Sequence, residues 1–387
     1  MTDRPAYSVS RLTLTDFRNY ASLRLEPDAR LVALAGANGA GKTNLLEALS
    51  LLVPGRGLRG AEFAQILRQG GAGTWAVAAS AHCPAGEVQL GTAWQPGEGE
   101  DNSQSRSVMI DGLQQRSSGA LGNWLRMVWL TPAMDRLFTG SPGERRRFLD
   151  RIVMLFDAEH GTRVNAFEKL MRERNRLLED VSPDRAWLSS LEAQMAETGV
   201  AIAAGRVGAL SHLAQYLAKD DGASPFPWGE VVIEGTLEAH VDEWPAVESE
   251  DHYRHLLAEG RAADRAAGRA LQGPHRSDLR VTHGPKAMAA ELCSTGEQKA
   301  LLIGLVLAQA RAVKALNGGA PILLLDEIAA HLDPARRKAL FGLLDGLGGQ
   351  VFMTGTEASL FDGAGPSAVV YQVENGQIVE SKSSHGE

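Results

Sequence analysis

Residues 36–43 are Gly36-Ala37-Asn38-Gly39-Ala40-Gly41-Lys42-Thr43, which matches the G-x-x-x-x-G-K-[ST] phosphate-binding pattern at every fixed position. A short apolar segment at 31–35 precedes them, and apolar residues with helical spacing follow at 44–52. Glycines let successive backbone N–H groups point at phosphate oxygens, and the following helix presents the positive end of its dipole. The stretch therefore predicts a nucleotide site in which Lys42 neutralises phosphate charge and the Thr43 hydroxyl binds Mg²⁺.

A pair of carboxylates ends a second apolar segment, about 290 residues further along the chain. Residues 322–327 are Ile322-Leu323-Leu324-Leu325-Asp326-Glu327. Asp326 suits a partner of Mg²⁺, and Glu327 suits a general base that polarises an attacking water. A buried strand with a polar end is common in α/β proteins, so the pair alone is moderate evidence. Together with the phosphate-binding loop, it predicts the second half of an ATP site.

A short polar run precedes a predicted helix over 297–316. This run, Ser294-Thr295-Gly296-Glu297-Gln298, resembles the signature motif of ATP-binding-cassette (ABC) ATPases. In that superfamily the motif contacts ATP held by the opposite subunit, so the resemblance implies such a role for Ser294 and Gly296 in a homodimer. Ser294 and Glu297 also fit a capping box, and both readings can hold because a capped helix N-terminus is an anion site. His331-Leu332-Asp333 resembles the D-loop, which contacts the partner's nucleotide.

One position departs from the ABC pattern. After the apolar residues 351–353, many of these ATPases carry a histidine that contacts the γ-phosphate, whereas this chain has Thr354-Gly355-Thr356. A hydroxyl can bond a phosphate oxygen but supplies no imidazolium charge. We therefore expect slow hydrolysis.

The remaining patterns divide the chain into three parts. Alternating apolar residues at 74–111 predict an antiparallel sheet, with a turn-rich break at 96–101. Residues 143–219 have helical spacing and predict two long helices folded back at Pro183, with a break near Gly161, as a projecting arm or as a bundle. Another helix is expected at 253–271, and the chain should close with a hairpin and a disordered tail at 382–387. We predict an α/β P-loop head of the ABC type built from both ends of the chain (1–130 and 273–387), with a mainly helical inserted lobe (131–272).

Three further runs resemble the RecF family. They are Leu14-Thr15-Asp16-Phe17-Arg18-Asn19-Tyr20, the segment from Leu130-Thr131-Pro132 to Leu149-Asp150, and Gly273-Pro274-His275-Arg276-Ser277-Asp278-Leu279. The wide separation of the two ATPase motifs around a helical insert is also similar to the SMC and RecF branch. The resemblance spans about residues 10–380. It implies a cytoplasmic protein that binds ATP, Mg²⁺ and DNA at single-strand gaps and junctions. It also implies RecO- and RecR-type partners and help in loading RecA.

Basic residues in the helical insert are the candidates for DNA contact. Arg145, Arg146, Arg147 and Arg151 cluster at its start. Others follow: Arg163, Lys169, Arg172, Arg174, Arg176, Arg261, Arg265 and Arg269. Any single one of them is better read as part of a solvated helix face, because glutamates are interspersed. As a set, and given the resemblance, they favour contact with phosphates. The roles of Arg56, Arg59 and Arg276 stay open.

Composition excludes some classes of protein. The formal net charge of −8 argues weakly against a nucleic-acid partner but does not detect local clusters. No apolar run approaches the roughly 20 residues of a membrane span, and no signal peptide is evident, so we expect a cytoplasmic protein without a membrane partner. The alternative is a transport-type or other ABC ATPase subunit without a DNA role. The long insert disfavours it, and no carboxylate cluster beyond the ATP site suggests a nuclease.

Overall fold

The computed structural model describes residues 5–27, 29–96, 106–217, 224–329, 332–365 and 368–381, with only the backbone of Glu380 and Ser381. The chain forms two compact units. The head unit comprises Met1–Met134, Asp220–Phe226 and Leu305–Glu387, and the helical unit comprises Asp135–Lys219 and Pro227–Gly304. Our assignment of all of 273–387 to the head is corrected, because 273–304 belongs to the helical unit. The predicted turn at 97–101, His331 and the predicted tail at 382–387 lie outside the described residues.

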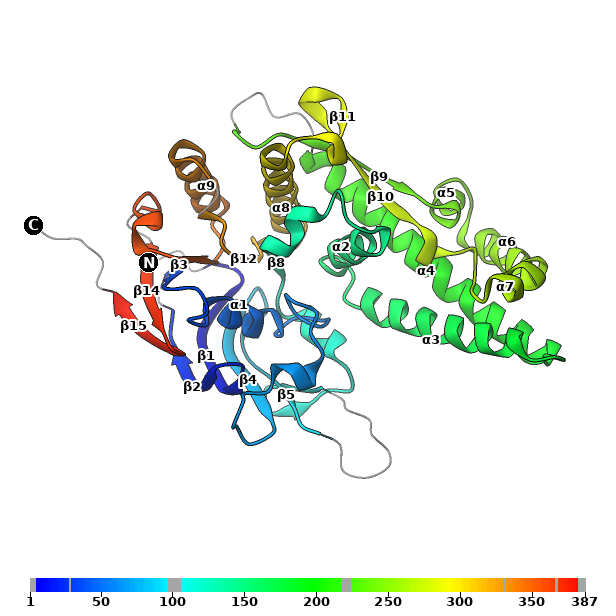
Figure 1. Cartoon of the computed structure of the whole chain (residues 1–387), viewed down its shortest axis with the longest axis horizontal. Helices are drawn as coiled ribbons and strands as arrows, with labels where there is room; N and C mark the ends of the chain where they lie inside the picture. The colour runs from blue at the N-terminus through cyan, green and yellow to red at the C-terminus, as the bar shows by residue number, and fades with distance from the viewer. Residues whose placement is uncertain are drawn as a thin grey trace, which may run out of the picture. The chain divides into compact units, whose positions relative to one another are not determined.

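The head contains a mainly parallel sheet, in the order β15-β14-β3-β13-β12-β8. Its strands are β3 (Leu31–Ala35), β8 (Met127–Leu130), β12 (Ile322–Leu325), β13 (Val351–Gly355), β14 (Ala368–Glu374) and β15 (Gln377–Ser381). Every residue of β3 and β12 is buried, as expected for strands covered on both faces. β14, near the C-terminus, pairs with β3, near the N-terminus (Figure 1). The carboxyl ends of β3, β13 and β12 therefore meet at one edge of the sheet.

An antiparallel sheet forms the second layer of the head, in the order β2-β1-β4-β5-β6-β7. Its strands are β1 (Ser8–Phe17), β2 (Tyr20–Leu25), β4 (Trp75–Cys83), β5 (Gly86–Trp94), β6 (Ser107–Ile110) and β7 (Leu113–Gln114). Buried and more exposed residues alternate along β4 and β5. The predicted antiparallel sheet is thus confirmed for the described strands of 74–111.

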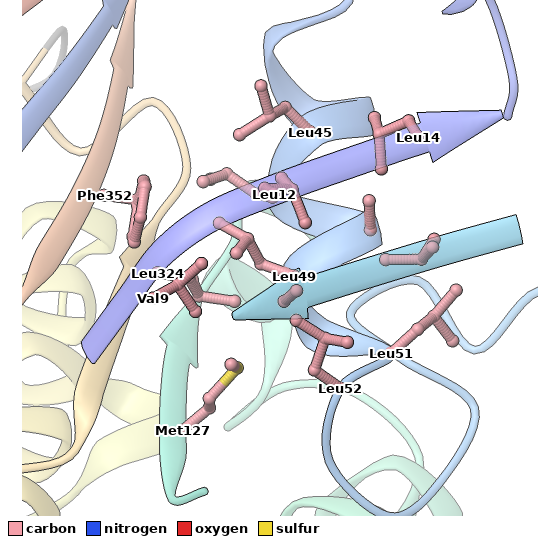
Figure 2. Packing of buried hydrophobic residues seen from close by; sticks show 14 of the residues in the cluster. Val9, Leu12, Leu14, Leu45, Leu49, Leu51, Leu52, Met127, Leu324 and Phe352 are labelled. Carbon is pink, nitrogen blue, oxygen red and sulfur yellow. The ribbon is translucent and has the colours of Figure 1, made fainter. Parts of the chain in front are cut away.

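The core of the head lies around the helix that follows the phosphate-binding loop, α1 (Lys42–Ser50). Leu45 and Leu49 of α1 pack with Leu12 of β1, Leu324 of β12 and Phe352 of β13, all essentially inaccessible to solvent (Figure 2). Apolar side chains from both sheets thus fix α1 in place. Because α1 begins at Lys42, the same packing fixes the end of the loop.

In the chain, the second carboxylate motif is preceded by helix α8 (Thr295–Asn317) and followed by helix α9 (Pro334–Leu347). Helix α8 has the length and composition of a membrane span, but 67% of its most apolar window is buried inside the structure. Its apolarity is accounted for by packing in the protein core. The sequence predicts both helices, at 297–316 and 334–347, and a closing hairpin over 369–379, all near the observed bounds.

The helical unit consists of α2 (Pro142–Met154), α3 (His160–Glu179), α4 (Arg185–Leu217), α5 (Thr236–Glu243), α6 (Ala246–Glu259) and α7 (Arg261–Ala267). A small antiparallel sheet completes it, formed by β9 (Gly229–Glu234), β10 (Asp278–His283) and β11 (Met288–Ala289). The predicted reversal at Pro183 is confirmed, and α3 and α4 lie side by side (Figure 1). The break in the first arm falls between Met154 and His160, just before Gly161. Because α4, about 50 Å long, also contacts α2, α5 and α6, the insert is a bundle.

Candidate functional site

The phosphate-binding loop depends on glycine at two positions. Gly36 has φ 154°, and a Cβ there would lie 2.3 Å from the carbonyl oxygen of Val373. Gly41 has φ 118°, and a Cβ there would lie 2.5 Å from Asn19 Nδ2. A side chain at either position would meet both backbone strain and a steric clash. The loop therefore curls tightly into the N-terminus of α1.

Neighbouring segments hold the loop in this shape. The carbonyl oxygen of Ala40 accepts hydrogen bonds from Asn19 Nδ2 at 3.0 Å and from the Gly376 N–H at 3.2 Å. The Tyr20 hydroxyl donates to the Gly41 carbonyl at 3.0 Å. The β1–β2 turn and the β14–β15 hairpin thus preorganise the loop. From the sequence, Asn19 and Tyr20 were recognised only as part of a family motif, and Gly376 only as part of a hairpin turn.

The Lys42 side chain is buried at the centre of the site. Its ammonium donates to the carbonyls of Gly36 at 2.6 Å and Ala37 at 2.9 Å. Burial lowers the pKa of Lys42, and the nearby carboxylates of Glu327 and Asp326 oppose that shift. The predicted cation and the predicted carboxylates therefore belong to one electrostatic site.

Asp326, which follows β12, links the end of β13 and the start of α1 through hydrogen bonds. Its carboxylate accepts hydrogen bonds from the Thr43 hydroxyl at 2.9 Å and from the Thr354 hydroxyl at 2.8 Å. Burial raises the pKa of Asp326, and the two hydroxyls partly offset that rise. A carboxylate and a hydroxyl in direct contact are the oxygen donors that Mg²⁺ prefers. The residues at this position fit the predicted metal ion.

The backbone at Glu327 is strained, with φ 51° in the left-handed region that non-glycine residues seldom adopt. The Glu327 N–H donates to Thr354 Oγ1 at 2.8 Å, which helps to hold this conformation. Strained backbone of this kind concentrates at functional positions.

Thr354 has a different role from the one its sequence position suggested. Its hydroxyl is fully buried and is engaged by both Asp326 and Glu327. The expectation that it could bond a phosphate oxygen is corrected, because that hydroxyl already makes both contacts. Thr356, two residues later, is exposed.

A polar cavity of about 470 Å³ lies beside α1 and was not predicted. It is lined by Arg18, Asn19, Asn44, Gln65, Leu67, Arg68 and Gln69. Beneath it the fully buried Glu47 carboxylate pairs with Arg18 at 2.8 Å and with Arg59 at 2.8 Å. Arg59 is therefore engaged within the head.

The predicted signature residues begin α8. Ser294 and Gly296 are exposed, and the Ser294 N–H donates to Glu297 Oε2 at 3.0 Å. Lys286, 2.5 Å from Glu297 Oε1, and Ser294 together lower the pKa of Glu297 to about 2. This part of the predicted capping box is present. The segment offers small, exposed residues at the N-terminus of a long helix.

Asp333 of the predicted D-loop caps α9, because its carboxylate accepts a hydrogen bond from the Arg336 N–H at 2.9 Å. This contact gives Asp333 a structural role in addition to the predicted one. It is exposed and stays a candidate for contact with nucleotide.

The predicted DNA-binding arginines do not form one surface. Arg145 is buried, with its guanidinium in two hydrogen bonds to Asp278 at 2.6 and 2.7 Å, so its prediction as a DNA contact is corrected. Arg146 is half-buried and donates to the Ser277 carbonyl at 2.8 Å. Arg151 lies over the Phe148 ring at 5.3 Å. Of these four, Arg147 is the one that is exposed.

The other basic positions also divide by burial. Arg174 is fully buried between Glu192 and Asp264, at 3.0 and 2.7 Å. Arg261 pairs with Glu192 as well, at 2.5 Å. The predicted helix of 253–271 breaks at Gly260 and ends at Ala267, so Arg269 lies outside it. Arg269 is therefore not on the helix that carries Arg261 and Arg265.

Comparison with known proteins shows the family to which this chain belongs. A family model described as the RecF/RecN/SMC N-terminal domain matches residues 8–379. The DNA replication and repair protein RecF of Mesorhizobium japonicum is 54% identical over 370 residues, covering 96% of this chain and 97% of the relative. That of Rhizobium meliloti is 51% identical over 370 residues, covering 96% and 98%. The chain belongs to the RecF family.

Solved structures show the same fold. A structure of the recombination mediator protein RecF with ATP has a TM-score of 0.85 and 21% identity, and covers 98% of this chain and 99% of that one. An SMC head domain from Pyrococcus furiosus has a TM-score of 0.53 and 16% identity, and covers 97% and 96%. The predicted ABC-type head with a helical insert is confirmed.

Proposed function

We propose that this chain binds ATP with Mg²⁺ in the head unit and hydrolyses it slowly. The observation that carries the proposal is the convergence of Lys42, Thr43, Asp326 and Glu327 at the carboxyl ends of β3 and β12, the two strands that flank β13. The polar cavity beside α1 has room and hydrogen-bonding groups for a base and ribose. The recombination mediator RecF, which has the same fold, was solved with ATP.

The roles of the residues follow from their positions. The loop N–H groups and Lys42 hold the phosphates, and Thr43 and Asp326 hold Mg²⁺, which when bound supplies positive charge to the phosphates. Glu327 orients a water and accepts its proton. Turnover is slow because no histidine follows β13 and the Thr354 hydroxyl is occupied within the protein.

ATP acts, in this proposal, as a switch for a homodimer. The exposed Ser294 and Gly296 of one copy contact the nucleotide held by the other copy, and Asp333 also contacts the partner's nucleotide. Nucleotide at the interface stabilises the dimer, and hydrolysis removes the phosphate contacts that hold it together. An exposed, capped helix N-terminus with small residues supports this role.

The dimer binds DNA at single-strand gaps and junctions and assists RecA loading together with RecO- and RecR-type proteins in the cytoplasm. Two facts support this proposal: relatives with about half of their residues identical are named as DNA replication and repair proteins, and a RecF of the same fold is placed in the RecFOR pathway. Arg147 is the candidate contact that its exposure leaves in place.

Gel shifts with duplex, single-stranded and gapped DNA test this function. We expect ATP with Mg²⁺ to tighten binding to gapped DNA, and Lys42→Met to remove that effect. The exposed Lys338 of α9 gives the control variant Lys338→Met, which should behave as the parent. Binding that ignores nucleotide on all three DNAs would contradict the proposal.

A further inference from the structure

The segment that joins α5 and α6, residues 242–248, is exposed throughout; we call it the elbow. Its apolar side chains are in solvent, with Trp244 51% exposed and Val247 71% exposed. By contrast, Trp75 and Trp94 of the head are buried. Tryptophan half-exposed beside a second apolar side chain is typical of a protein-binding surface.

The Trp244 ring is held in place by its neighbours. It stacks on His240 with centroids 5.9 Å apart and planes at 28°, and His240 stacks on His252 at 4.3 Å and 10° (both α5 and α6 are in Figure 1). His240 Nδ1 also lies 3.0 Å from the Ser249 hydroxyl. Leu237 and Tyr253 anchor the two helices in the core beneath. A ring that is already ordered loses little entropy when a partner binds.

The surroundings of Trp244 are strongly acidic. Thr236–Glu259 contains seven acidic residues and one arginine, a formal charge of −6 within a chain whose total is −8. Glu238 pairs with Arg206, Asp251 with Arg254 and Glu259 with His255. The other four make no ion pair within the part of the chain that the structure describes; they are Asp242, Glu243, Glu248 and Glu250. An exposed indole therefore lies among uncompensated carboxylates.

We propose that the elbow is a docking surface for a basic, arginine-containing segment of another protein. A guanidinium can stack on the indole and pair with a carboxylate at the same time, which a lysine ammonium does less well. Val247 offers contact to an apolar residue of the same segment. Nucleic acid is excluded as the occupant because the surface repels phosphates. The elbow contains no residue of the nucleotide site, and its proposed partner is a protein.

Fluorescence anisotropy with the full-length protein tests the proposal. The probes are three labelled peptides that contain glycine, one leucine and either arginine, lysine or glutamate. We expect binding of the arginine peptide that weakens at high salt, several-fold weaker binding of the lysine peptide, and none of the glutamate peptide. Trp244→Ala should lower the affinity for the arginine peptide by about tenfold or more. The double variant Glu243→Lys with Glu248→Lys should abolish binding.

Trp187→Ala is the matched control, because Trp187 is also 51% exposed but lies on α4. It should bind the arginine peptide as the parent does. Equal binding by Trp244→Ala and the parent, or equal loss in both tryptophan variants, would overturn the proposal. So would equal binding of the arginine and lysine peptides. ATP-dependent association, measured on the same samples, should be unchanged, so failure of the nucleotide proposal is separately visible.

Discussion

The nucleotide site of the head and the arginines of the helical unit were predicted from the same kind of observation, which is short runs of sequence that contain suitable side chains. The structure keeps the first set together and divides the second. Lys42 and Thr43 meet Asp326 because parallel strands deliver their carboxyl ends to one edge. Arg145 and Arg147, two residues apart on α2, differ completely in exposure.

The difference lies in what the chemistry requires. A phosphate-binding loop is a local backbone shape, so the sequence that encodes it is contiguous and its context can be checked. A DNA-binding surface requires exposure, which depends on how helices pack. Along an amphipathic helix, residues alternate between the exposed and the buried side every few positions. A run of arginines on such a helix therefore places some side chains on the buried side. Four substitutions test whether local sequence and exposure explain this difference.

The largest effect is expected for Lys42→Ala in the head. The variant loses a buried cation facing the phosphates, and ATP affinity should fall by about two orders of magnitude, about 3 kcal/mol. Calorimetric titration of ATP with Mg²⁺ measures the change. Lys338→Ala, an exposed lysine of the same unit, should leave affinity as it is. Unchanged affinity in Lys42→Ala would remove the central residue from the site.

Arg174→Ala should destabilise the helical unit by about 3–5 kcal/mol, because it leaves the buried Asp264 carboxylate unpaired and removes one of the two arginines that pair with Glu192. Arg172→Ala is the matched control on the same helix, with a side chain 69% exposed and a weak pair to Glu168 at 3.8 Å. It should cost no more than about 0.5 kcal/mol. Hydrogen exchange of the α3 and α4 amides measures both. Similar costs would show that burial does not separate these arginines.

Thr354→Val should raise the Mg²⁺ requirement of ATP hydrolysis by about tenfold, because it removes a hydroxyl from both Asp326 and Glu327. Burial raises the pKa of Asp326, and the Thr354 hydroxyl lowers it. Protonation removes the metal-binding carboxylate, so the Mg²⁺ requirement should grow as the pH falls toward the raised pKa of Asp326.

That growth should begin at higher pH in Thr354→Val than in the parent, while Thr354→Ser restores the parent profile. Initial rates across Mg²⁺ concentration and pH provide the measurement. A variant that is less active but has an unshifted pH profile would indicate a purely structural role for Thr354.

The smallest effect is expected for Arg147→Ala. Loss of one phosphate contact should lower the affinity for DNA a few-fold and lower the salt slope of binding by about one. Arg254→Ala, in the acidic α6 segment, should change neither. An unaltered salt slope in Arg147→Ala would leave the helical unit without a supported DNA contact.

The sequence predicts much of the fold where hydrophobic pattern and local motif agree. The bounds of β3, β12 and α9 are reproduced because each has a clear apolar period and a turn or cap at its end. β8 and β10 were not predicted; each overlaps one end of a motif that was read for its chemistry. The break before His160 was placed close to its true position, whereas Gly260 and Gly268 were not recognised as helix ends.

The sequence predicts less of what holds the site in shape. Asn19, Tyr20 and Gly376 contact the loop from segments remote in sequence, and no spacing rule connects them to it. Thr354 was noticed for the wrong contact, because its direction depends on the register of β13 with β12. Such long-range contacts follow from tertiary packing and not from local pattern.

Sedimentation velocity of Glu327→Gln tests the central claim most directly. This variant keeps the side-chain size at Glu327 while removing the carboxylate that accepts a proton, so bound ATP should persist. If nucleotide holds the dimer together, we expect monomers without nucleotide and stable dimers with ATP and Mg²⁺. Monomers under both conditions, in a variant shown to bind ATP, would contradict it.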